Sequence, residues 1–209
     1  MFNTQIAVDE FARLQKEYGF RTCFETGTHT GVGSLGASEF CELVITSELN
    51  PDRRDEAIKR FIESGYSLAS EFKAHDEKCF VKGSKQINSL LGNSPECLRH
   101  SLRYELNPNI KPLPQPYCFY LDAHWDPNNW PLRPELQVIA DFKLADSVII
   151  IHDAKVPQDA VPGNGLGYDS YNGQDLDYDY VKDLLAAINP NYKIRYNEQG
   201  PRGILYALP

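Results

Sequence analysis

The sequence predicts an α/β fold: a three-layer sandwich in which helices cover both faces of a mostly parallel, seven-stranded sheet that ends in an antiparallel hairpin. Two observations predict this fold. Short apolar segments alternate with amphipathic, helical segments along the chain, which is typical of a parallel sheet with helices on both sides. The last two apolar segments are separated only by the turn NEQGPRG, which is short enough to pair them as a hairpin.

The first expected element is a helix within residues 1–19. Its apolar residues Phe11, Leu14 and Tyr18 recur at helical spacing, and Gly19 follows as a stop. Asn50-Pro51 opens another helix, because proline is favoured in the first helical turn. The remaining helices are expected to begin near Gly31, Ser84, Pro131 and Asp175.

The seven expected strands are short and mostly apolar. The run SVIII is the clearest, because a strand without polar alternation suits a sheet that is covered on both faces. The expected strands comprise residues 22–24, 43–46, 79–81, 117–121, 147–151, 192–196 and 203–208. We expect residues 1–209 to form one domain, with a homodimer as a compatible assembly.

Composition excludes several classes of partner. The chain has 21 basic and 29 acidic residues, a net charge of −8 and no Lys/Arg cluster, so nucleic acid is not an expected partner. It contains no apolar run of the roughly 20 residues that cross a bilayer, and its start lacks the pattern of a secretory signal. Its five cysteines are scattered and form no C-x-x-C pair, so we expect a cytoplasmic protein without a disulfide framework.

A glycine-containing turn, ETGTHTG, follows the first expected strand. Gly27 and Gly31 would let the backbone come close to a ligand, and the next helix would offer unpaired N–H groups. Glycines after a strand are also common as plain turn residues. Glu48 ends the second strand, where an acid accepts hydrogen bonds from ribose hydroxyls in nucleoside-binding sheets. Alternatively, Glu48 is only a carboxylate near a helix N-terminus.

Together, the E-x-G-x-x-x-G turn and the acid at Glu48 resemble the class I S-adenosylmethionine-dependent methyltransferases, whose fold is Rossmann-like. The resemblance extends over nearly the whole chain, including the C-terminal hairpin. It implies that the first loop surrounds the methionine part of the cofactor, Glu48 binds the ribose, and Gly83-Ser84 lies beside the adenine. His29 is a departure, because the fuller motif has a third glycine there. The cofactor-binding residues implied are Glu25, Gly27, Thr28, His29, Gly31, Glu48, Leu49, Gly83, Ser84 and Asp122.

A second group of polar residues ends the fourth and fifth strands. The fourth ends in Asp122 and His124, and the fifth in His152 and Asp153. In the family's strand order, 3-2-1-4-5, these strands are neighbours, and neighbouring strands lie about 4.8 Å apart. We therefore expect Asp122, His152 and Asp153 to be able to bind Mg²⁺ or another divalent metal, with all four residues as catalytic candidates. The alternative is that Asp122 only contacts the cofactor and Asp153 caps a turn.

This second group resembles the metal-assisted O-methyltransferases of the macrocin and cephalosporin-cluster types. The resemblance implies methyl transfer to an oxygen of a small-molecule acceptor, with deprotonation assisted by a divalent metal or a histidine. Two rival interpretations remain open. One is another nucleotide- or NAD(P)-dependent enzyme on the same scaffold, and the other is a cofactor-binding protein without turnover.

Two further segments lie beside this group. Trp125 and Trp130 share one loop, where they either stack on a ligand or cover the apolar end of the sheet. Residues 154–174 form a long loop that we interpret as a lid. Because Asp169, Asp175, Asp177 and Asp179 make this region acidic, a neutral, polyhydroxylated or cationic acceptor is expected rather than a phosphorylated one.

Overall fold

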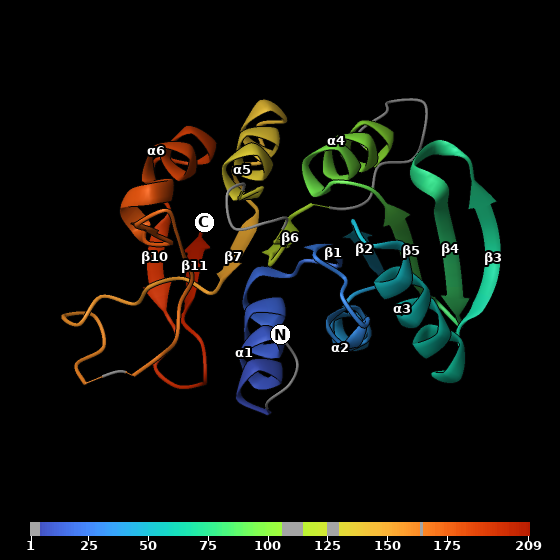
Figure 1. Cartoon of the computed structure of the whole chain (residues 1–209), viewed down its shortest axis with the longest axis horizontal. Coiled ribbons are helices and arrows are strands. Elements are labelled where there is room, and N and C mark those ends of the chain that lie inside the picture. The colour runs from blue at the N-terminus through green and yellow to red at the C-terminus, as the bar shows by residue number, and fades with distance from the viewer. Residues whose placement is uncertain (1–4, 106–114, 125–129, 164) are drawn as a thin grey trace.

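The computed structural model of the chain describes residues 5–105, 115–124, 130–163 and 165–209. Within these residues a nine-stranded sheet has the order β10-β11-β7-β6-β1-β2-β5-β4-β3 (Figure 1). Its centre is a parallel block formed by β7 (Val148–His152), β6 (Tyr117–Leu121), β1 (Thr22–Thr26), β2 (Leu43–Glu48) and β5 (Lys85–Leu91). This order confirms the expected arrangement, in which the first, fourth and fifth parallel strands are neighbours.

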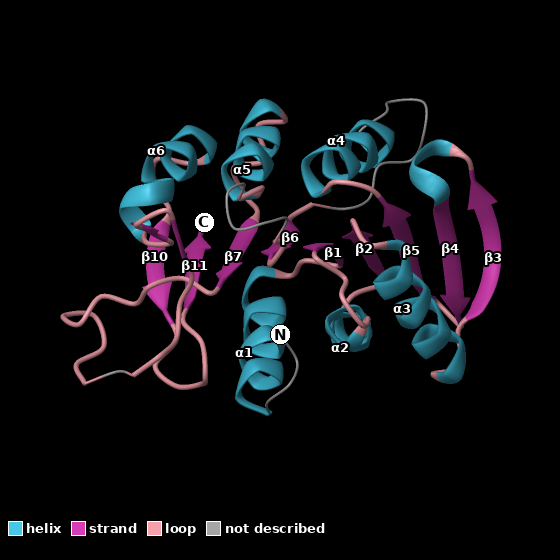
Figure 2. Cartoon of the chain, viewed as in Figure 1, coloured by secondary structure: helices cyan, strands magenta, loops and turns pink. Residues whose placement is uncertain are grey.

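Helices cover both faces of the sheet, as the sequence predicted (Figure 2). One layer contains α1 (Gln5–Tyr18), α2 (Val32–Phe40) and α3 (Pro51–Glu63), and the other contains α4 (Ser94–Glu105), α5 (Leu132–Asp141) and α6 (Tyr178–Ile188). Each layer encloses its own apolar core. Phe11, Ala37 and Phe61 pack in the first core, and Leu102, Leu136 and Leu185 in the second. The three-layer α/β/α prediction is therefore confirmed.

The C-terminal hairpin is also confirmed. It consists of β10 (Lys193–Tyr196) and β11 (Ile204–Leu208), which pair antiparallel. Strand β11 then pairs antiparallel with β7, so that Ile204 lies opposite His152. The expected lid segment contains a small two-stranded sheet, formed by β8 (Ser170–Tyr171) and β9 (Gln174–Asp175).

The other end of the sheet differs from the prediction. The segment expected to be the third parallel strand is β4 (Glu77–Lys82), which runs antiparallel to both of its neighbours, β3 (Ser67–Phe72) and β5. The helix expected near Ser84 is instead β5, and the helix begins only at Ser94. Lys82 pairs with Lys85, so Gly83-Ser84 is a two-residue hairpin turn, and the two extra strands raise the count from seven to nine. A short 3₁₀ helix, Ala74–Asp76, joins β3 to β4.

Among the described residues no helix is both long enough and apolar enough to cross a membrane.

Candidate functional site

A cavity of about 490 Å³ opens at the carboxyl edge of the central parallel strands. This volume lies within the roughly 300–1,000 Å³ of typical ligand sites, and the location is where ligands bind in open α/β sheets. Its wall is formed by the first turn, the end of β2, the segment after β5, and the ends of β6 and β7. The lining residues are Glu25, Gly27, Thr28, His29, Thr30, Val32, Gly33, Ser47, Glu48, Leu49, Gly92, Ser94, Asp122, Ala123, His124, His152 and Asp153.

The first turn follows β1 and is held against the ends of β2 and β6, the strands on either side of β1. The backbone N–H groups of Gly27 and Thr28 both donate to the Ser47 carbonyl oxygen, at 3.0 Å. Gly27 has φ +81°, and a Cβ atom there would lie 2.7 Å from the carbonyl oxygen of Asp122. Only glycine fits this approach, because any side chain would meet the backbone at the end of β6.

Glu48 is oriented by backbone donors. The N–H of His29 donates to Glu48 Oε2 at 2.7 Å, and the N–H of Asn50 donates to Oε1 at 3.0 Å. His29 itself has φ +49°, in the left-handed region that glycine favours. The position at which the sequence departs from the glycine motif therefore keeps a glycine-like backbone. It also presents its N–H to the acid at the end of β2.

Glu25 is buried at the base of the cavity. Its Oε2 atom accepts hydrogen bonds from the hydroxyls of Ser34 and of Thr46, the second at 2.8 Å. Burial raises the pKa of Glu25 to about 7, although these hydrogen bonds act in the opposite direction. Gly33 packs directly on this carboxylate, since an added Cβ would lie 2.0 Å from Glu25 Oε1. Sequence reasoning missed Gly33, although its place two residues after Gly31 extends the glycine pattern.

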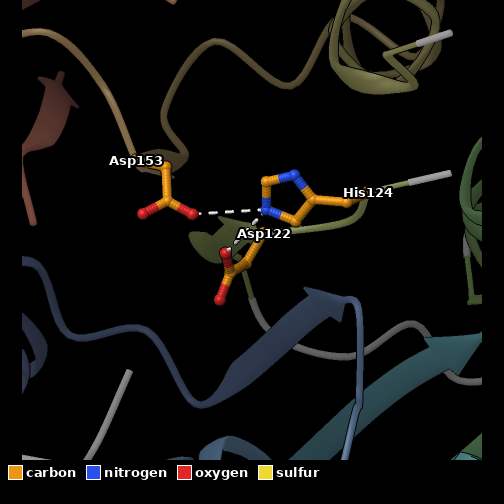
Figure 3. Close-up of side chains that lie close together, drawn as sticks. All are labelled: Asp122, His124 and Asp153. Atoms are coloured by element: carbon orange, nitrogen blue, oxygen red, sulfur yellow. Dashed lines mark ion pairs between the residues drawn. The ribbon is translucent and has the colours of Figure 1, made fainter. Parts of the chain in front are cut away.

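Asp122, His124 and Asp153 converge at the other side of the cavity (Figure 3). His124 Nε2 lies 3.3 Å from Asp153 Oδ2 and 3.6 Å from Asp122 Oδ1. Its Nδ1 lies 3.2 Å from both Asp169 Oδ2 and the hydroxyl of Tyr171, which belong to the expected lid segment. Hydrogen bonds to Asp122 and Asp153 raise the pKa of His124 to about 11.

His152 lies beside the same two carboxylates. Its Nδ1 is 3.2 Å from Asp122 Oδ1 and 3.1 Å from Asp153 Oδ1, but this buried atom has no well-aligned hydrogen-bond partner. Burial lowers the pKa of His152, but the two carboxylates outweigh this effect and raise it to about 9. In return, the histidines hold the pKa of Asp122 and of Asp153 below the ordinary value, although burial acts in the opposite direction.

Two more charged groups join this cluster. Arg202, on the turn before β11, donates through Nε to Asp153 and through a terminal nitrogen to Asp169. A buried carboxylate on α5, Glu135, accepts from the Ser94 hydroxyl, and burial raises its pKa to about 7. The sequence analysis named Asp169 only as part of the acidic lid and did not name Arg202, because neither residue follows the carboxyl end of a parallel strand. An isolated β-bridge between Gly167 and Arg202 brings Arg202 and the neighbouring Asp169 to the cluster.

One group of described residues could hold a metal ion. The ligand atoms of Asp122, His124 and Asp153 all lie within 4.8 Å of one another. The sequence predicted both carboxylates and named His152 as the imidazole ligand. The structure adds His124 to the two carboxylates, and His152 Nδ1 also lies beside them. Two carboxylate oxygens and one imidazole nitrogen suit a divalent cation, so the residues fit the expected metal.

The resemblance placed Gly83-Ser84 beside the adenine, but these two residues do not line this cavity. These residues form the turn that precedes β5, at the edge of the sheet opposite to the cavity. Gly92 and Ser94, which follow β5, line the cavity in their place. Gly31 does not line the cavity either. It packs on α3, since an added Cβ would lie 2.8 Å from the Phe61 ring.

Trp130 lies in the core that α5 and α6 cover. It is 8% exposed and makes ring contacts with Tyr171 and Tyr180, with centroids 4.3 and 5.2 Å away. For this tryptophan the interpretation as a cover of the apolar end of the sheet is correct. Trp125 lies outside the described residues.

Several solved structures have the same fold. One is the O-methyltransferase from Bacillus cereus in complex with SAH, which is 14% identical, with a TM-score of 0.61 over 99% of this chain and 82% of that chain. A second is the O-methyltransferase TomG from Streptomyces achromogenes, involved in tomaymycin synthesis and in complex with SAM. It is 15% identical, with a TM-score of 0.59 over 98% of this chain and 80% of that chain. A third is the SAH-bound methyltransferase PaMTH1 from Podospora anserina, at 14% identity and a TM-score of 0.55 over 99% and 79% of the two chains. No protein-family model and no curated protein matches the sequence significantly.

The chain therefore shares its fold with these methyltransferase structures, and the C-terminal hairpin that the sequence predicted is part of it. At identities of 14–15% the likeness defines the fold alone. What the chain does must be argued from the residues of the site.

Proposed function

We propose that the protein is an S-adenosylmethionine-dependent methyltransferase that methylates an oxygen of a small-molecule acceptor. The observation that carries this proposal is the position of Glu48. Its carboxylate is fixed by the N–H groups of His29 and Asn50 at the wall of a cavity that Gly27 keeps open. An oriented acid at the end of the second strand, facing a glycine turn at the end of the first, matches the needs of a nucleoside cofactor.

The residues present fit this cofactor. Glu48 and Leu49 would hold the ribose, and Gly92 and Ser94 line the wall where the adenine would lie. Glu25, Gly27, Thr28 and Gly33 form the opposite end, which would take the methionine part. When bound, the cofactor supplies a methyl group on a positively charged sulfur. The buried floor and the carboxylates around it would exclude water and favour that charge.

Methylation of a hydroxyl requires the loss of its proton. The acceptor oxygen forms a bond to the methyl carbon while the carbon–sulfur bond breaks, so the oxygen must be deprotonated before or during the transfer. Asp122, His124, His152 and Asp153 are the groups on the cavity wall that could assist.

Two forms of assistance are open to this cluster. Asp122, His124 and Asp153 would hold a divalent cation, whose charge would lower the pKa of the acceptor hydroxyl. Alternatively, no metal takes part. The imidazoles of His124 and His152 would then balance Asp122 and Asp153 and lie beside the developing oxyanion, and one of these carboxylates would take the acceptor proton and release it to water. Arg202 and both histidines lie against Asp153, so a bound cation would share this carboxylate with them.

Calorimetric titration with S-adenosylhomocysteine tests the proposal. We expect micromolar binding to the wild-type chain and a loss of at least tenfold in Glu48→Ala. Glu63→Ala removes an equally charged, exposed residue at the end of α3 and should bind as the wild type does. Absence of binding to the wild-type protein, or equal binding by both variants, would contradict the assigned cofactor site.

The same titration with and without Mg²⁺ separates the two forms of assistance. If a cation binds at the cluster, Mg²⁺ should change the heat of binding in the wild type and not in Asp122→Ala. A wild-type heat that is unaffected by Mg²⁺, together with methyl transfer that survives a chelator, would leave the histidines as the assisting groups.

A further inference from the structure

A second cavity adjoins the first. It has a volume of about 660 Å³ and lies between α1 and the C-terminal hairpin. His152 lines both cavities, so the second one reaches the cluster that would activate an acceptor. The first cavity is the proposed place of the cofactor, which leaves the second for another molecule.

Strand register shows how its floor is built. Ile204 lies opposite His152, and Tyr206 lies opposite both Ile150 and Arg195. Residues opposite one another, and those two positions apart on one strand, point to the same face of a sheet. His152, Ile204, Tyr206 and Arg195 therefore share the face that α1 covers. Two strand spacings and two residue steps separate His152 from Arg195, which places their Cα atoms about 12 Å apart.

The two ends of this floor differ in chemistry. Its middle is apolar and aromatic, formed by Ile204 and Tyr206. At the far end the Arg195 guanidinium lies 5.1 Å from the centroid of the Tyr206 ring. Its ion-pair partner is Glu10, and Glu10 also pairs with Arg13. Glu10 is thus shared by two guanidinium groups at this end of the cavity, and Arg13 also pairs with Glu17.

The acidic segment that we expected to disfavour a phosphorylated acceptor does not line this cavity. Asp169 pairs with Arg202, and Asp175 pairs with Lys155 at 2.6 Å. The charged groups lining the second cavity are Asp9, Glu10, Arg13, His152, Arg195, Glu198 and Arg202. The Arg195 guanidinium lies over the Tyr206 ring, so an anion that enters this end of the cavity along Ile204 would meet it.

We propose that this cavity is the acceptor site and that the acceptor is a hydroxylated aromatic acid, with its hydroxyl toward His152 and its carboxylate toward Arg195. This inference rests on the proposed function and names its substrate class. The apolar floor suits the ring, and a guanidinium group is well suited to bind a carboxylate. A single ring with substituents at opposite ends fits between two side chains whose Cα atoms are about 12 Å apart.

Paired probes that differ in one charge test the inference. Calorimetry would compare 3,4-dihydroxybenzoate with 3,4-dihydroxybenzamide, each titrated into the full chain saturated with S-adenosylhomocysteine. We expect the benzoate to bind the wild type about tenfold more tightly than the benzamide. Arg195→Gln should abolish this preference. Lys193→Gln removes a positive charge from an exposed position on the same strand and should preserve it.

A second variant should act in the opposite direction. Glu10→Gln removes the carboxylate that competes for Arg195, so the benzoate should bind this variant more tightly than it binds the wild type. Equal binding of both probes to the wild type, or weaker benzoate binding by Glu10→Gln, would overturn the inference. If either result is obtained while the wild type still binds S-adenosylhomocysteine, only the acceptor inference fails and the methyltransferase proposal stands. If the wild type does not bind S-adenosylhomocysteine, the methyltransferase proposal fails.

Discussion

Replacing Glu25 by glutamine should make the protein more stable at pH 8 and change the pH dependence of its unfolding. The Glu25 carboxyl is 4% exposed, and burial raises its pKa from an ordinary value of 4.5 to about 7. Between these two pH values the unfolded chain loses the proton while the folded chain keeps it. The free energy of unfolding therefore falls as pH rises through this window, and the loss is complete above pH 7. The pKa difference corresponds to about 3 kcal/mol.

Urea unfolding of the wild type and of Glu25→Gln, measured from pH 4 to pH 8.5, isolates this effect. Other titrating groups, including Glu135, cancel in the difference between the two proteins. The Ser34 and Thr46 hydroxyls both donate to Oε2, and an amide oxygen can accept both bonds, but the amide replaces the other carboxylate oxygen by an NH₂ group, which adds an offset that does not depend on pH. We expect the stability of Glu25→Gln relative to the wild type to increase by about 3 kcal/mol between pH 4.5 and pH 7.5.

An exposed glutamate provides the control. Glu56→Gln changes a residue whose side chain is 48% exposed and should give a difference that is nearly independent of pH. If the difference in unfolding free energy between Glu25→Gln and the wild type is also independent of pH, the reasoning is refuted. Glu25 would then ionise in the folded chain as it does in the unfolded chain.

Two further predictions concern the first turn and the tryptophan. Gly27→Ala should weaken S-adenosylhomocysteine binding at least tenfold, since its Cβ would lie 2.7 Å from the Asp122 carbonyl oxygen. Gly83→Ala, with φ +60° and nothing within 4 Å of an added Cβ, has a similar backbone conformation without the close approach and should bind normally. Equal binding by the two variants in calorimetry would show that the close approach has no effect. Trp130→Ala should cost about 3–5 kcal/mol of unfolding free energy because it empties a buried position against Tyr171 and Tyr180. A loss below about 1 kcal/mol in urea unfolding would contradict the packing described for this residue.

Most of the parallel sheet could be predicted because its strands carry a local signal. The strands β1, β2, β6 and β7 are almost entirely buried, so each appears in the sequence as a short apolar run. The strand β5 lacks that signal. Its sequence KQINSLL contains polar residues such as Asn88, whose side-chain amide donates to Glu77 on β4. The turn Gly83-Ser84 was the available clue, because two residues of this kind between two strands are typical of a hairpin.

The sequence by itself determined which acidic residues and which glycine turn lie at the site. Residues at the carboxyl ends of parallel strands meet at one edge of the sheet, regardless of the conformation of the loops that follow. Glu48, Asp122 and Asp153 belong to this group. Only the tertiary structure decided that His124 joins the two carboxylates in the possible metal group, and that Arg202 reaches Asp153. It also decided that His152 lines a second cavity beside α1. These features depend on side-chain direction and on contacts between distant segments, which packing selects and which local sequence patterns do not specify.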